Sequence, residues 1–224
     1  MSDRKEMLQE ALMAQRQMLV DAIGKRAEDI PQAFTPYKEV LDVYDQGLEL
    51  PDDVTIIWPD DNYGYMKRLS SPKEQKRSGR SGVYYHSSYL GKPHDHLWMN
   101  TTSPTLMYEE LRKAYDLTAD RIWLLNAGDI KSCEFAVDYF LTMAFDIDSF
   151  NFERAANYRT EWLCGMLGND YRNEYQDVIN SFYKLAFARK PEFMGWGYQW
   201  ATDKHGRERN TAVSYTHLTL PTIL

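Results

Sequence analysis

The chain has 224 residues, of which 43% are hydrophobic and 14% aromatic, enough to build one large domain or two small ones around a sizeable core. Its formal net charge of -7 argues against a nucleic-acid partner, because phosphate binding requires a basic surface. No apolar run approaches the ~18 residues of a membrane span, and the two cysteines, Cys133 and Cys164, form neither a disulfide framework nor a CxxC metal motif, so both are expected to be buried thiols.

The first two predicted elements are amphipathic helices. Residues 5–24 repeat apolar side chains at helical spacing and end at Gly24, a residue suited to a helix C-terminus. A second helix is expected to begin at Thr35-Pro36, where a capping hydroxyl precedes a proline, and to end near Gly47 and Pro51.

Three strands are predicted at 54–58, 82–86 and 121–125, the first of them buried, because these runs are rich in β-branched and aromatic side chains. The connection 60–81 is polar and basic, and Ser71 to Glu74 has the form of a capping box that predicts a short helix. Ser103-Pro104 predicts the start of another helix.

A further helix follows the third strand, with Glu134 near its start. Its apolar positions are expected to form the buried face, namely Val137, Phe140, Leu141, Ala144 and Phe145. Beyond about residue 147 no further strand is predicted, and apolar side chains recur at helical spacing over 152–163 and 175–186.

The alternation of strands and helices predicts an α/β fold, with parallel strands joined by right-handed crossovers. Three strands cannot close a barrel, which usually needs about eight. The chain is therefore interpreted either as an open sheet or as a partial (β/α)8 barrel followed by an α-helical segment.

Polar residues follow each of the predicted strands. In parallel α/β sheets ligands bind beyond the carboxyl ends of the strands, so a polar ligand site with carboxylates for acid–base chemistry is one interpretation. The alternative is that these residues are only polar turns. The residues concerned are Asp60, Asp61 and Asn62 after the first strand, His86 at the end of the second, and Asn126 and Asp129 after the third.

His94 and His96 flank Asp95, a pattern that invites a metal-site interpretation. Histidines two residues apart project to opposite sides of a strand, and the sequence offers no evident third ligand. Neither a metal nor another cofactor is therefore predicted.

Three long segments resemble glycoside hydrolase family 115, the xylan α-glucuronidases. They are VTIIWPDDNYGY at 54–65, GVYYHSSYLGKPHDHLWMNTTSP at 82–104 and WLLNAGDIKSCE at 123–134. The resemblance extends over about 30–210. It implies that 1–147 is the C-terminal part of a (β/α)8 catalytic barrel and that 148–211 begins a helical domain.

The resemblance also implies an activity. The family removes glucuronic acid, or its 4-O-methyl ether, from the α-1,2 linkage to xylose in xylan with inversion of configuration. Glucuronoxylan would then be the substrate, without a cofactor, a nucleic acid or a membrane as partner. Family likeness further suggests a secreted or periplasmic protein and a homodimer formed through domains outside this chain.

Site residues follow from the same resemblance. Glu134 matches the glutamate of the family's GDIKxxE motif and is expected to be a catalytic carboxyl, with Asp61 as its partner. Lys92 stands where the family usually has arginine, which would weaken a bidentate grip on the uronate carboxylate. Sugar hydroxyls would be held by Asp60, Asn62, His86, Asn126, Asp129 and Asn157.

Structural alternatives exist for three of these residues. Glu134 could interact with the N-terminus of its own helix, Asp129 is expected to act as a helix N-cap, and Asn157 could be an ordinary surface residue.

The segment 212–224 does not fit its surroundings, because it carries no Asp, Glu, Lys or Arg directly after a highly charged stretch. It resembles sequencing-adapter DNA read as coding sequence. We therefore expect 212–224 to be non-native and to pack against nothing, and the chain to be an internal fragment of a longer enzyme.

Two other classes of function compete with a glycosidase fragment. One is a non-catalytic carbohydrate-binding or scaffold α/β module, which would show an aromatic cleft without paired carboxylates. The other is a helical interaction protein, which would show an apolar surface on the helices at 150–190.

Overall fold

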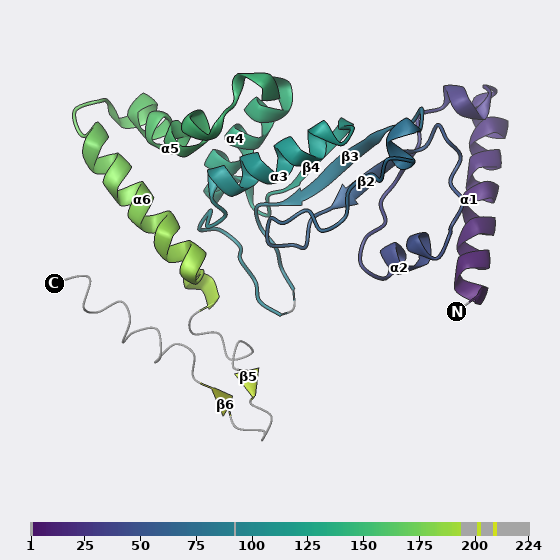
Figure 1. Ribbon diagram of the computed structural model, residues 1–224, viewed down its shortest axis with the longest axis horizontal. Coiled ribbons are helices and arrows are strands. Elements are labelled where there is room, and N and C mark those ends of the chain that lie inside the picture. The colour runs from purple at the N-terminus through teal and green to yellow at the C-terminus, as the bar shows by residue number, and fades with distance from the viewer. Residues whose placement is uncertain (1, 92, 194–200, 203–207, 210–224) are drawn as a thin grey trace. The chain divides into compact units, whose positions relative to one another are not determined.

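The computed structural model describes residues 2–91, 93–193, 201–202 and 208–209 (Figure 1). The expectations for Lys92 and for the segment 212–224 therefore concern residues outside these ranges. The chain divides into two compact units: unit 1 contains residues 1–85 and 109–125, and unit 2 contains residues 86–108 and 126–224. Each unit is described by itself.

A four-stranded sheet has the strand order β1-β2-β3-β4. β1 pairs in parallel with β2, and β2 pairs in parallel with β3. Beside β4, the Ser81 amide donates to the carbonyl of Thr118 where the two strands begin, and the Ser87 amide donates to Asn126 where they end. The predicted parallel α/β fold is thus confirmed. The strands are β1 (Ala33–Phe34), β2 (Thr55–Pro59), β3 (Ser81–His86) and β4 (Ala119–Asn126).

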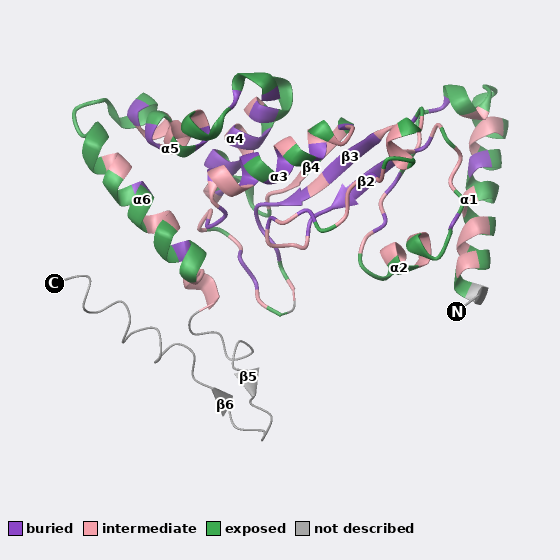
Figure 2. Ribbon diagram, in the orientation of Figure 1, coloured by how far each residue is buried: buried purple, intermediate pink, exposed green. Residues whose placement is uncertain are grey.

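The centre of the sheet is almost fully buried. Figure 2 shows β2 and β3 buried along most of their length, and Ile56, Trp58 and Val83 are each 0% exposed. Gly82 allows β3 to approach β4 closely, because a Cβ atom at this position would overlap the backbone carbonyl of Ile122. Burial on both faces explains why these strands read as continuous apolar runs.

The first helix, α1 (Ser2–Ile23), ends as predicted at Gly24, whose φ of 71° lies in the left-handed region and whose amide donates to Val20. The second helix, α2 (Glu39–Asp45), begins later than predicted. Lys38 has a φ of 52°, so the backbone is not helical until Glu39, and Thr35-Pro36 lies in the irregular segment between β1 and α2.

The predicted capping box in the β2–β3 connection is confirmed. The Ser71 amide donates to the Glu74 carboxylate at 2.7 Å, and the Glu74 amide donates to the Ser71 hydroxyl at 3.4 Å. The helix it begins is a short 3₁₀ turn, η2 (Glu74–Lys76). The helix predicted after Ser103 is α3 (Pro104–Asp116), with Leu111 and Ala114 fully buried.

Unit 2 is mainly helical. Tyr139 is the centre of its aromatic cluster, with Phe135, Phe150 and Tyr158 at ring-centroid distances of 6.0, 5.5 and 5.1 Å. Such edge and stacked contacts stabilise a core beyond the area that they bury. The helices are α4 (Glu134–Phe145), α5 (Phe152–Leu167) and α6 (Arg172–Ala188), together with the 3₁₀ turns η3 (Ile130–Ser132), η4 (Ile147–Ser149) and η5 (Pro191–Phe193).

Two sequence predictions for this unit were wrong in detail. The buried face of α4 includes Phe140 but not Leu141 or Phe145, which are 56% and 93% exposed. The helix turns its Phe135–Tyr139 face toward the aromatic cluster, so that packing and not apolar content alone selects the buried side. Two short antiparallel strands, β5 (Ala201–Thr202) and β6 (Glu208–Arg209), also occur beyond residue 147.

Cys133 and Cys164 are free and buried, as predicted. Among the described residues, no helix has the length and apolar character required to cross a membrane.

A matched pair of substitutions tests the packing of the sheet. Gly82→Ala places a methyl group against the Ile122 carbonyl and should lower the free energy of unfolding by about 2–3 kcal/mol. Gly165→Ala, in α5, meets no atom within 4 Å and should raise it by up to ~1 kcal/mol, because alanine is the better helix former. Urea denaturation measures both, and equal effects of the two substitutions would contradict the close β3–β4 approach.

Candidate functional site

The loop after β2 is organised by its own two carboxylates. Asp60 is 5% exposed, and its carboxylate accepts the amides of Asn62 at 3.1 Å and Gly64 at 3.0 Å. Asp61 uses Oδ1 to accept the amides of Tyr63 at 3.0 Å and Tyr65 at 3.1 Å. These bonds follow the usual tendency of Asp to bind nearby backbone amides in turns.

The second oxygen of Asp61 faces a cation, since Lys67 Nζ lies 3.5 Å from Oδ2. Asn62 adopts a left-handed backbone with a φ of 71°, and its Oδ1 accepts the hydroxyl of Tyr37 at 2.7 Å. The loop is therefore held by its own carboxylates and by Tyr37, which also belongs to unit 1. Asp60 is buried, and Asp61 is half-buried.

The ends of β3 and β4 are joined in unit 2. The carbonyl of Asn126 accepts the amides of Ser87 at 3.0 Å and Ser88 at 3.1 Å, and the side chain of Asn126 accepts the amide of Gly128 at 3.3 Å. Gly128 has a φ of 62°, and a Cβ atom there would lie 2.6 Å from the Ser88 hydroxyl. His86 is 1% exposed, with its ring edge-on to Tyr89 at 5.7 Å.

Glu134 is the first residue of α4 and is exposed. Its carboxylate makes no hydrogen bond or ion pair with the part of the chain that the structure describes. The alternative that Glu134 caps its helix through a side-chain bond is thus not seen, although a carboxylate in a first turn still interacts favourably with the helix dipole.

Cys133, immediately before Glu134, is fully buried. Burial raises the pKa of the Cys133 thiol, a hydrogen bond with Ser132 opposes this, and the carboxylates of Glu134, Glu192 and Asp129 raise it further. The charges of three carboxylates therefore act on one buried thiol. Sequence reasoning found Glu134 and Asp129 but missed Glu192, which belongs to none of the recognised motifs and lies far along the chain.

The structure also gives the positions of the remaining predicted site residues. Asp129 occupies the N-cap position of η3, but its side chain makes no capping hydrogen bond, so the predicted capping role was wrong. Asn157 lies half-buried on α5. By unit, Asp60, Asp61 and Asn62 lie in unit 1, and His86, Asn126, Asp129, Glu134 and Asn157 lie in unit 2.

The His94-Asp95-His96 segment is used structurally. His96 exchanges both backbone hydrogen bonds with Tyr89, at 2.7 and 3.0 Å, and Asp95 accepts the Gly91 amide at 2.6 Å. Burial and the charge of Arg189 lower the pKa of His94. Across the described ranges, no group of three or more His, Cys, Asp or Glu side chains is arranged to hold a metal ion.

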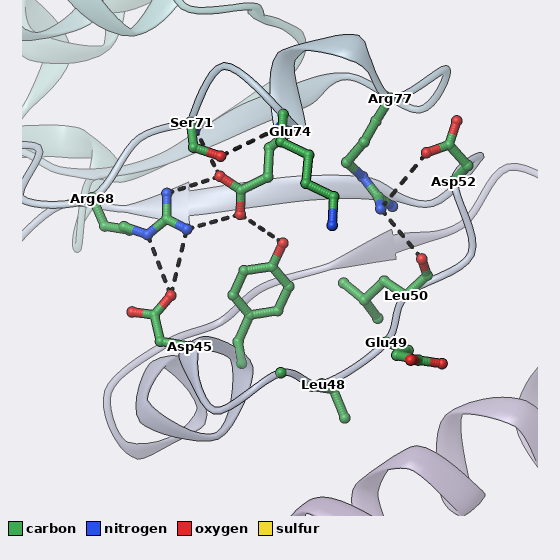
Figure 3. Close-up of a pocket in the computed structure, with 12 residues that line it drawn as sticks. Asp45, Leu48, Glu49, Leu50, Asp52, Arg68, Ser71, Glu74 and Arg77 are labelled. Atoms are coloured by element: carbon green, nitrogen blue, oxygen red, sulfur yellow. Dashed lines mark hydrogen bonds and ion pairs between the residues drawn. The ribbon is translucent and has the colours of Figure 1, made fainter.

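Unit 1 contains a pocket of about 670 Å³, and Figure 3 shows residues that line it. Its central carboxylate, Glu74, accepts two hydrogen bonds from Arg68, at 3.0 and 2.8 Å, and one from the Tyr44 hydroxyl at 2.8 Å. Arg77 donates to the carbonyls of Leu50 and Pro51. The pocket thus consists largely of charges that are already paired.

This pocket adjoins the starts of the strands. Residues 47–52 lead into β2, and Arg77 shortly precedes β3. In parallel α/β proteins this edge contributes to stability, whereas the carboxyl edge carries chemistry. We therefore assign the pocket a structural role and retain the carboxyl-edge residues as the candidate site.

The parallel sheet defines the class of protein as α/β. Carboxylate and amide side chains follow its strands, as they do in many α/β enzymes. The chain belongs to glycosyl hydrolase family 115, whose family model matches residues 1–193. It is also similar to a solved structure described as the family GH115 4-O-methyl-alpha-glucuronidase BtGH115A, with specificity for decorated arabinogalactans. The two are 43% identical, with a TM-score of 0.82.

The match covers 87% of this chain and 26% of the other, so the chain spans about a quarter of that relative's length. No curated protein matches the chain.

The pH dependence of stability tests the pocket network. Burial disfavours the ionised form of Glu74, but hydrogen bonds from Arg68, Ser71 and Tyr44 outweigh it and lower its pKa from 4.5 to about 2. A lowered carboxylate pKa contributes stability above the unfolded-state value, and this contribution is lost as pH falls through the folded-state value. The deficit of Glu74→Gln relative to wild type should therefore shrink between pH about 4.5 and about 2.

Denaturant midpoints measured across this pH range check the expectation. Glu49→Gln is the matched control, because the exposed Glu49 carboxylate has no partner among the described residues. A Glu74→Gln deficit that does not change with pH would contradict the ionised network.

Proposed function

We propose that the chain is part of a glycoside hydrolase that removes α-linked glucuronic acid, or its 4-O-methyl ether, from a polysaccharide. The observation that carries this proposal is the carboxylate of Glu134, which is exposed and has no hydrogen-bond or ion-pair partner among the described residues, and which follows β4 in a chain belonging to family 115. The length of the solved relative supports the view that the active enzyme is longer than this chain.

The proposed chemistry is an inverting hydrolysis with two carboxyl groups. One protonates the leaving oxygen, and the other activates a water molecule on the opposite side of the sugar. We assign Glu134 as one of the pair and Asp61 as the other. Glu134 is exposed, so its carboxyl group can donate or accept a proton. In Asp61, backbone amides hold Oδ1, and Oδ2 faces Lys67.

The other predicted site residues are proposed to bind sugar hydroxyls. Asn62, Asn126, Asp129 and Asn157 are at least partly exposed and suit direct contact. Asp60 and His86 are 5% and 1% exposed, so we propose that these two act by holding the loops that carry the others.

Glucuronoxylan is the proposed substrate. Decorated arabinogalactan is a second candidate, because specificity for it is stated for the solved relative. Release of 4-O-methylglucuronic acid from each polysaccharide, measured side by side on the full-length enzyme, separates the two. Release from neither would favour a non-catalytic carbohydrate-binding or scaffold module.

Helices α5 and α6 carry the exposed apolar side chains that a helical interaction protein would show. Family membership nevertheless favours the glycosidase, because an apolar surface on part of a larger enzyme is equally compatible with packing inside that enzyme. The exposed residues are Phe152, Met166, Leu167, Val178, Leu185 and Phe187.

Glu134→Gln tests the mechanism in the full-length enzyme. Glutamine keeps the size of the side chain but cannot transfer a proton, and general acid–base catalysis contributes about 10²–10⁴-fold. We expect kcat to fall by at least ~100-fold, with little change in KM or melting temperature.

Glu153→Gln is the matched control, because Glu153 is likewise an exposed carboxylate in the first turn of a helix, α5. It should leave kcat unchanged. If Glu134→Gln kept more than roughly a third of the wild-type kcat, Glu134 would have no part in proton transfer, because loss of a general acid or base lowers kcat by about 100-fold or more.

A further inference from the structure

The residues just before Glu134 are held by a loop, residues 97–102, that is distant in sequence. The side-chain amide of Asn100 donates to the carbonyl of Ser132 at 2.7 Å, and the Cys133 thiol donates to the carbonyl of Leu97 at 3.6 Å. Asn100 has a φ of 50°, a left-handed conformation that asparagine tolerates better than most residues. Both residues immediately before Glu134 thus contact the 97–102 loop.

The 97–102 loop is in turn held by the segment that follows α6. Glu192 accepts the Leu97 amide with both carboxylate oxygens, at 2.9 and 3.0 Å, and its Oε1 also accepts the Trp98 amide at 3.1 Å. Lys190 donates to the Thr101 hydroxyl at 2.9 Å. Hydrogen bonds from backbone amides to a carboxylate are among the stronger ones in proteins.

Burial affects both members of the Lys190–Thr101 contact. Burial lowers the pKa of Lys190 to about 8, and the Glu192 carboxylate opposes that shift. Thr101 is 4% exposed, so its hydrogen bond with Lys190 is shielded from water. The two contacts hold opposite ends of the 97–102 loop.

We propose that Glu192, assisted by Lys190, is a positioning residue that fixes the Glu134 carboxylate by clamping the 97–102 loop against Ser132 and Cys133. The clamp makes the helical segment after α6 part of the catalytic apparatus. The inference rests on the proposed role of Glu134, but its mechanical part can be measured without catalysis.

Cys133 supplies that measurement, because it adjoins Glu134 and is 0% exposed. In the 224-residue chain with Cys164→Ser, Cys133 is the only thiol, and its rate of reaction with a disulfide reagent reports how often the clamped segment opens. Glu192→Ala should speed labelling by at least ~10-fold. Glu192→Gln keeps the Oε1 acceptor for both amides and should label nearly as slowly as the parent.

Glu174→Ala is the matched control, an exposed carboxylate on α6 that should not change the labelling rate. Circular dichroism confirms that each variant is folded. Should Glu192→Ala fail to fold, Asn100→Asp replaces the amide donor to the Ser132 carbonyl with a carboxylate oxygen that cannot donate, and it should speed labelling in the same direction. An unchanged labelling rate in a folded Glu192→Ala or Asn100→Asp chain would overturn the clamp.

Kinetics of the full-length enzyme test the positioning role itself. Glu192→Ala should lower kcat by about 10-fold or more, with a KM within about twofold of wild type, and Glu192→Gln should restore most of the loss. A KM effect without a kcat effect would overturn positioning of Glu134. If Glu134→Gln is fully active, the proposed function fails, and the labelling rates still decide whether Glu192 clamps the loop.

Discussion

The candidate site depends on one constraint, the burial of Cys133 next to an exposed carboxylate. The thiol is 0% exposed and contacts the Leu97 carbonyl, whereas Glu134, the next residue, begins α4 at the surface. Because the preceding residue is fixed in the interior, the direction in which Glu134 leaves the backbone is fixed as well. A catalytic carboxylate must be held in this way, since small displacements of reacting groups reduce rates strongly.

The two segments that carry the proposed carboxylates are rigidified by different means. The loop after β2 is held by Asp60 and Asp61, which together accept four backbone amides of their own loop. The segment before α4 has no such internal carboxylate bonds, because Asp129 makes no capping hydrogen bond, and it relies on Asn100 and Glu192 from elsewhere in unit 2. Local sequence therefore explains the first arrangement, and tertiary contacts explain the second.

The same division explains which features the sequence predicts. The buried strand at 54–58, the strand at 82–86, the capping box at Ser71 and the helix stop at Gly24 depend on local patterns, and the structure confirms them. Strand β1, with two residues, is too short to show a pattern, and α2 begins late because of the backbone conformation of Lys38. The buried face of α4 and the contact of Glu192 with the 97–102 loop depend on packing partners that no local pattern identifies.

In the proposed mechanism, Glu134 and Asp61 act as a pair of catalytic carboxyl groups. The most direct test is an experimental structure of the full-length enzyme with glucuronic acid bound, in which the distance between the two carboxyl groups is measured. An inverting mechanism predicts a separation of roughly 6.5–9.5 Å, with the anomeric carbon of the sugar between them. A separation well beyond this range, or a sugar bound away from Glu134, would exclude Glu134 and Asp61 as the catalytic pair.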